Sequence, residues 1–77
     1  MISLLKATHL IHDEAKRACT KHPPMNSHHE AYAVILEELE EYWIEVMKRP
    51  SKRDPEALKL ELIQTAAMCL RTLHDLC

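Results

Sequence analysis

The stretch YAVILEELEEYWIEV (residues 32–46) combines an apolar stripe with a dense run of carboxylates. Its apolar residues recur at intervals of three and four, the spacing of one face of an α-helix: Tyr32, Ile35, Leu36, Leu39, Tyr42, Trp43 and Val46. Glu38, Glu41 and Glu45 fall nearly opposite that stripe at about 100° per residue. The stretch therefore predicts a helix, reaching about Lys48, whose stripe belongs to the core or to a subunit interface.

The residues before this stretch predict how its helix begins. In Ser27-His28-His29-Glu30, a capping box would let Ser27 accept from the amide of Glu30 while the Glu30 side chain returns to the amide of Ser27. The preceding segment, residues 22–26, contains two consecutive prolines that cannot donate a helical hydrogen bond. It is expected to be a largely extended loop.

Two further helices flank this central one in the sequence. Apolar residues at helical spacing predict a first amphipathic helix from Ile2 to about Cys19. Asp54-Pro55-Glu56 is typical of a helix start, with a capping aspartate and a proline at the first position, and predicts a third helix to about Leu76. The chain has no glycine and no phenylalanine. These features predict an all-α fold of three helices in a single domain, residues 1–77.

The middle of the third predicted helix is apolar or small around most of its circumference. This segment, residues 62–70, reads LIQTAAMCL and must be covered on several sides. Three helices in so short a chain leave part of that surface in water. We therefore expect helices of a second subunit to cover it, in a homodimer or a tetramer.

Composition excludes several classes of partner and site. The formal net charge is -2 and the longest basic run is Lys52-Arg53, so we expect no nucleic-acid partner. The three cysteines form no Cys-x-x-Cys pair, which argues against a disulfide scaffold or a zinc ribbon. No apolar run is long enough for a signal peptide or a membrane span. We expect no membrane partner and a cytoplasmic location.

A narrow polar seam runs along the third predicted helix through Glu61, Gln64, Met68, Arg71 and Asp75. A seam of this kind must be paired where it is buried. Packing it against the acidic side of the central helix would bring Glu38, Glu41, Glu61 and Gln64 around one point. Hard oxygen donors select Mg²⁺, with Mn²⁺ as an alternative. The competing interpretation is an acidic helix face that is simply solvated.

Two acidic motifs on successive helices resemble those of a known family. Glu37-Glu38-x-x-Glu41 followed by Glu61-x-x-Gln64 is similar to the Glu-Glu-x-x-Glu and Glu-x-x-Asp pair of the MazG-like, all-α nucleoside triphosphate pyrophosphohydrolases. The flanking segments 26–35 and 61–68 resemble a small subgroup that is often encoded by phages or prophages. The resemblance covers about residues 20–76. It implies a phage protein acting in the cytoplasm of a bacterial host.

The resemblance implies a reaction and roles for the matching residues. The reaction is cleavage of a nucleotide between its α- and β-phosphates, which releases the monophosphate and pyrophosphate. In this family the matching positions bind Mg²⁺, which assigns the metal to Glu38, Glu41, Glu61 and Gln64. Glu37 would bind a further ion or orient the attacking water, so Glu37 and Glu38 are the expected catalytic residues.

The chain departs from the family pattern in two ways. Gln64 stands where the wider family has Asp, which removes one negative charge from the ligand set. Fuller members also continue beyond a third helix with basic residues that hold phosphates. The candidates here are Arg71, Lys21 and other basic side chains, with Asn26 or His28 at the mouth of a nucleotide pocket.

Two alternatives to catalysis stay open. One is a binding module that keeps the fold and binds a nucleotide without turnover, as Gln64 would allow. The other is a helical interaction protein with a solvated acidic face. A zinc site among His22, His28 and His29 fits no common ligand spacing.

Overall fold

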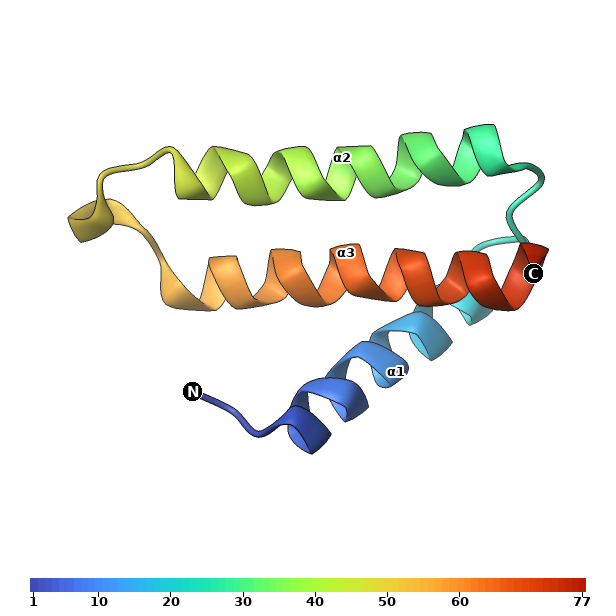
Figure 1. Ribbon diagram of the computed structural model, residues 1–77, viewed down its shortest axis with the longest axis horizontal. Coiled ribbons are helices and arrows are strands. Elements are labelled where there is room, and N and C mark those ends of the chain that lie inside the picture. The colour runs from blue at the N-terminus through green and yellow to red at the C-terminus, as the bar shows by residue number, and fades with distance from the viewer.

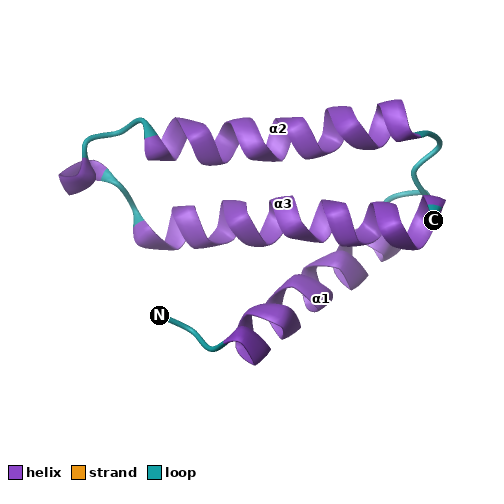
Figure 2. Cartoon of the chain, in the orientation of Figure 1, coloured by secondary structure: helices purple, strands orange, loops and turns teal.

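The computed structural model describes all residues, 1–77, and consists of three α-helices and one short 3₁₀-helix. These are α1 (Leu4–Lys21), α2 (His28–Val46), η1 (Pro50–Lys52) and α3 (Pro55–Leu76). The chain contains no strand, as Figure 2 shows. The prediction of an all-α chain with three helices is confirmed, and each predicted helix matches an observed one to within about two residues.

The helix α3 is central to the arrangement. In Figure 1, α2 and α3 run antiparallel and side by side, while α1 crosses α3 obliquely near its C-terminal half. Both α1 and α2 pack against α3. No helix is both long enough and apolar enough to span a bilayer. Residues 47–54, which include η1, connect α2 to α3. This short connection allows the acidic side of α2 to face the polar seam of α3.

Each α-helix begins at a residue whose side chain caps it. Ser3, Ser27 and Asp54 accept from the backbone amides of Lys6, Glu30 and Glu56, respectively. The predicted capping box is confirmed for the Ser27 side chain and wrong for the Glu30 side chain. The Glu30 carboxylate bonds to the backbone amide of Asn26 at 3.3 Å and to its side-chain amide at 3.0 Å, and not to the amide of Ser27.

The core is built from small and flexible side chains. It comprises Ala15, Ala18, Met25, Ala31, Ala67 and Met68, and no large apolar side chain is fully buried. Alanines allow helix axes to approach closely, and the two methionines fill the irregular space that remains. A protomer with so small a core has little apolar burial from which to gain stability.

Substituting Ala67 by leucine should destabilise the protein strongly. Ala67 is 0% exposed, so a larger side chain would force α3 away from its neighbours. We expect the free energy of unfolding in urea to fall by about 1–3 kcal/mol, the usual effect of overpacking. Ala33→Leu is the matched control, because Ala33 is exposed on α2. Equal effects of the two substitutions would contradict the packing described above.

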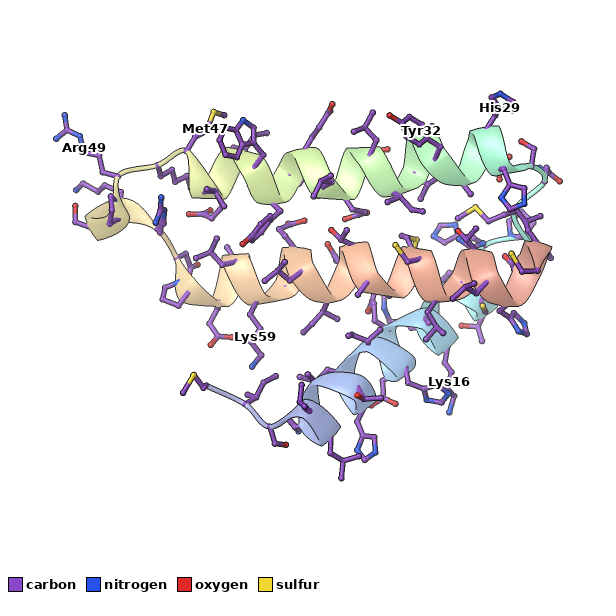
Figure 3. All side chains as sticks on the ribbon, viewed as in Figure 1. Lys16, His29, Tyr32, Met47, Arg49 and Lys59 are labelled. Atoms are coloured by element: carbon purple, nitrogen blue, oxygen red, sulfur yellow. The ribbon has the colours of Figure 1, made fainter.

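Much of the apolar stripe of α2 lies outside the core, although Ile35 packs against it. Tyr32 is 68% exposed, Trp43 is 57% exposed and Leu39 is 47% exposed. Figure 3 shows Tyr32 and Met47 on the side of α2 that points away from α3. The core alternative for this stripe is therefore wrong for these residues, because α2 turns its acidic side toward α3 instead. The subunit-interface alternative stays a prediction.

Candidate metal centre

Three carboxylates from two helices meet between α2 and α3. Glu38, Glu41 and Glu61 each place one oxygen within 4.8 Å of the others. Glu38 and Glu41 are three residues apart, so they occupy one side of α2, and the antiparallel packing of α3 brings Glu61 opposite them. These are three of the four residues that the sequence predicts around one point; the fourth, Gln64, lines a neighbouring hollow.

Two of these carboxylates contain buried oxygens without hydrogen-bond partners. The Oε2 atoms of Glu38 and Glu61 are inaccessible to solvent and accept no hydrogen bond. A buried acceptor of this kind costs free energy unless a donor or a cation compensates it. One oxygen each of Glu38 and Glu61 is thus shielded from water, whereas Glu41 is exposed. Unpaired carboxylate oxygens that converge from two helices fit the ligand set of Mg²⁺ or Mn²⁺.

The cluster disfavours its own ionisation. Burial raises the pKa of Glu38, and the charges of Glu41, Glu37 and Glu14 raise it further. Burial also raises the pKa of Glu61 to about 7, and the nearby carboxylates of Glu41 and Glu38 raise it further. Without a cation, Glu61 therefore keeps a proton that an ordinary glutamate has lost.

The raised pKa of Glu61 predicts that the metal-free protein loses stability as the pH rises. Between its ordinary pKa of 4.5 and a folded-state value of about 7, the unfolded chain releases a proton that the folded protein retains. The unfolded state then binds fewer protons, so the free energy of unfolding falls across this interval. The measurement is urea unfolding at pH 5 and pH 7.5 with a chelator present.

The Glu61→Gln variant isolates this contribution. It has no carboxyl group at position 61 to titrate, so its stability should change less than that of the wild type between the two pH values. An identical pH dependence in both proteins would show that Glu61 ionises normally.

A hollow of about 470 Å³ adjoins the carboxylate cluster. Glu38 belongs to both the cluster and the wall of the hollow. Glu37, Gln64 and Arg71 are the other predicted site residues that line it. The structure thus places Gln64 and Glu38 in the wall of the same hollow, together with Glu37, whose charge acts on Glu38.

The predicted phosphate-binding residues are divided between the hollow and the surface. Arg71 is buried in its wall, where its guanidinium donates to the carbonyl of Pro23 while its Nε has no hydrogen-bond partner. Lys21, Asn26 and His28 do not line the hollow. Asn26 is bonded to Glu30, and Lys21 and His28 are exposed at helix ends. Of the predicted phosphate-binding residues, Arg71 is therefore the one that lines the hollow.

The helix α1 contributes two residues to this hollow that the sequence pattern did not indicate. Glu14 and Arg17 line the hollow, and Arg17 forms an ion pair with Glu14 through its guanidinium. The spacing along α1 could have indicated Glu14, because it is four residues before Ala18 and therefore lies on the side of α1 that carries the small residues. Small residues on a helix face indicate close approach of another helix, so a carboxylate beside them is drawn toward the interior.

Glu45 has a structural role, although it shares the acidic side of α2. Its carboxylate accepts from Lys48 Nζ at 2.9 Å and from the backbone amide of Asp54 at 3.0 Å. The bonds from Lys48 and Asp54 lower the pKa of Glu45. Glu45 therefore ties the end of α2 to the start of α3, and it does not take part in the cluster.

Comparison with models of known families, with curated proteins and with solved structures found no match to this chain.

Proposed function

We propose that the protein is a Mg²⁺-dependent nucleotide pyrophosphohydrolase of the MazG-like kind. The observation that carries this proposal is the pair of buried, unpartnered oxygens on Glu38 and Glu61, which converge with Glu41 from two helices beside a hollow. The ordered motifs Glu37-Glu38-x-x-Glu41 and Glu61-x-x-Gln64 support the same reaction by resemblance. The substrate is a nucleoside triphosphate, cleaved between its α- and β-phosphates.

Each residue has a role that its position supports. Glu38, Glu41 and Glu61 hold the ion, and Gln64 offers a carbonyl oxygen from the wall of the hollow. A bound Mg²⁺ supplies charge that polarises a phosphate and lowers the pKa of a water molecule. Glu37 accepts a hydrogen bond from the attacking water and orients it.

The cations of the hollow recognise the phosphates. Arg71 and Arg17 both line the hollow. Arg71 Nε lies 3.6 Å from Asp75 Oδ2 and Arg17 is paired with Glu14, so a phosphate would bind to the remaining donors of the two guanidinium groups. The hollow also contains Glu14, Glu30, Glu37 and Glu38, so its protein charge is negative without an ion. A nucleotide anion therefore binds together with the metal, whose positive charge offsets these carboxylates.

The proposed functional unit is a homodimer or a tetramer, acting in the cytoplasm of a bacterial host. The small core and the exposed Tyr32, Leu39 and Trp43 support assembly through the outer face of α2. A second hollow on that face, about 390 Å³ in volume, is lined by Leu36, Leu39, Glu40, Tyr42 and Trp43. Side chains of a partner helix would fill it.

The assembly prediction is tested with a charge on this face. Light scattering at micromolar concentration should give a mass of at least twice 9.0 kDa for the wild type. Trp43→Lys should shift the mass toward that of one chain, because a buried interface does not tolerate an unpaired charge. Leu4→Lys is the control, since Leu4 is 90% exposed on α1. A folded monomeric wild type, or dissociation by Leu4→Lys alone, would contradict this prediction.

The proposed activity is tested by pyrophosphate release. The full chain would be incubated with a panel of ribo- and deoxyribonucleoside triphosphates, with Mg²⁺, with Mn²⁺ or with a chelator. We expect equal amounts of monophosphate and pyrophosphate, dependent on the added ion. Release of orthophosphate, or release that persists with the chelator, would reject the proposal.

Gln64 favours a second candidate function, which is nucleotide binding without turnover. It lines the hollow beside Glu38 but contributes no charge, so the ligand set has one negative charge fewer than the family pattern. Calorimetry with a nonhydrolysable nucleotide and Mg²⁺ separates the two candidates. Tight binding without any pyrophosphate release would establish the second.

A further inference from the structure

A second group of metal-binding side chains lies away from the carboxylate cluster, where α1 crosses the C-terminal end of α3. Cys19 on α1 and His74 and Asp75 on α3 each place one ligand atom within 4.8 Å of the others. These are three different donor types, a thiol sulfur, an imidazole nitrogen and a carboxylate oxygen. None of them lines the hollow of the nucleotide site, although Asp75 contacts Arg71, which lines the hollows at both sites.

Asp75 is the fixed member of this group. Its side chain is 6% exposed, and its Oδ2 accepts from the backbone amide of Met25 at 2.9 Å and lies 3.6 Å from Arg71 Nε. Its Oδ1 lies 4.0 Å from Nε2 of His74. The loop and Arg71 therefore hold one oxygen and leave the other directed at His74. Ligand carboxylates in metal sites are oriented by outer hydrogen bonds of this kind.

We propose that Cys19, His74 and Asp75 bind Zn²⁺ or a similar transition metal ion. Sulfur and imidazole donors select zinc over Mg²⁺, and three protein ligands suffice when the fourth position is open. In a tetrahedral site with Zn–S and Zn–N bonds of about 2.3 and 2.0 Å, ligand atoms lie roughly 3.5 Å apart. Cys19 and His74 are exposed, so their side chains are free to close that remaining distance onto Asp75.

Charge and access agree with this assignment. A thiolate and a carboxylate together balance the charge of a divalent ion, while Arg71 remains on the opposite oxygen of Asp75. Cys19 and His74 also line a hollow of about 500 Å³, together with His12, Lys16 and Thr20. Because Cys19 and His74 line this hollow, a water molecule or a small anionic ligand could reach an ion held between them.

Cobalt titration of the full chain tests the proposal. Thiolate coordination to Co²⁺ gives a near-ultraviolet charge-transfer band that the carboxylates of Glu38, Glu41 and Glu61 cannot produce. We expect one Co²⁺ per chain with this band, displaced by Zn²⁺. Cys19→Ser should remove the band, and His74→Ala should weaken binding by more than the roughly 10- to 100-fold that loss of an outer partner costs.

Matched controls make the result specific to this group. Cys69→Ser and His9→Ala replace an exposed cysteine and an exposed histidine elsewhere, and both should leave the band unchanged. Zn²⁺ should also slow alkylation of Cys19 by iodoacetamide and leave alkylation of Cys69 unaffected. A band that persists in Cys19→Ser, that is unaffected by His74→Ala, or that disappears in Cys69→Ser would overturn the proposal. Because these readouts require no hydrolysis, they are independent of the proposed activity.

Discussion

Glu61→Gln should reduce Mg²⁺-dependent hydrolysis by more than about a hundredfold while raising the melting temperature of the metal-free protein. Loss of even an outer partner of a metal ligand costs about 10- to 100-fold, so loss of a ligand charge should cost more. The opposite effect on stability has the same origin. Replacing the carboxylate removes its repulsion with Glu38 and Glu41, and the new amide can donate to Glu41.

Glu38→Gln should behave in the same way, because Glu38 also has a buried unpartnered oxygen and a raised pKa caused by burial and neighbouring charges. Glu41→Gln should abolish hydrolysis with a smaller gain in stability, since Glu41 is exposed. In the wild type, Mg²⁺ should raise the melting temperature by mass action. In these variants that increase should be reduced or absent. Hydrolysis and differential scanning fluorimetry measure the two effects separately.

Glu56→Gln is the appropriate control for this series. It removes a carboxylate from α3 five residues before Glu61, and the Glu56 side chain is 82% exposed. Glu45→Gln is unsuitable despite its place on the same side of α2, because it would break the bonds to Lys48 and Asp54. Unchanged hydrolysis in Glu61→Gln, or an equal loss in Glu56→Gln, would show that the cluster does not hold the catalytic ion.

The carboxylate cluster could be predicted from the sequence because it depends on two local periodicities. The i, i+3 spacing of Glu38 and Glu41 places them together on any helix, and the same holds for Glu61 and Gln64. A short connection makes α2 and α3 antiparallel neighbours. A polar seam on an apolar helix also favours packing against another polar surface, and the burial of one oxygen each of Glu38 and Glu61 between α2 and α3 agrees with this packing.

The features that escaped prediction depend on the crossing of α1, which periodicity does not determine. An amphipathic helix can pack at several angles and rotations, so the sequence did not place Glu14 and Arg17 at the hollow or Cys19 beside His74 and Asp75. The role of Glu45 was hidden for a related reason. One of its partners is the backbone amide of Asp54, and the pattern of side chains in a sequence does not indicate where a backbone amide will lie.

The burial of Glu45 and the exposure of Trp43 show that α2 faces inward with its acidic side. The apolar stripe alone favours an inward Trp43, yet α2 turns Glu45 inward instead, and a buried carboxylate requires partners. Glu45 finds them in Lys48 and in the backbone amide of Asp54 at the start of α3. The stripe is consequently left on the outside, where Trp43 is 57% exposed. The orientation of α2 that brings the carboxylates together thus also exposes the apolar face for which we propose a partner subunit.

Gln64→Glu and Gln64→Asp should strengthen Mg²⁺ binding by about tenfold or more and should increase hydrolysis. Each restores a negative charge next to Glu38 at the wall of the hollow. A gain of 1.4 kcal/mol in binding free energy corresponds to a factor of ten, which is modest for a full charge at a divalent ion. Glutamate keeps the length of glutamine, whereas aspartate reproduces the residue of the family pattern.

The cost of this added charge distinguishes a ligand position from a neighbouring one. Without a cation, a fourth carboxylate adds repulsion to the cluster, so both variants should unfold at a lower temperature than the wild type in chelator and at a higher one in excess Mg²⁺. The melting temperature of each variant should therefore start below that of the wild type and rise above it as Mg²⁺ is added. Variants that are destabilised at every Mg²⁺ concentration would place position 64 outside the metal's reach, and the affinity of the cluster would then rest on Glu38, Glu41 and Glu61 alone.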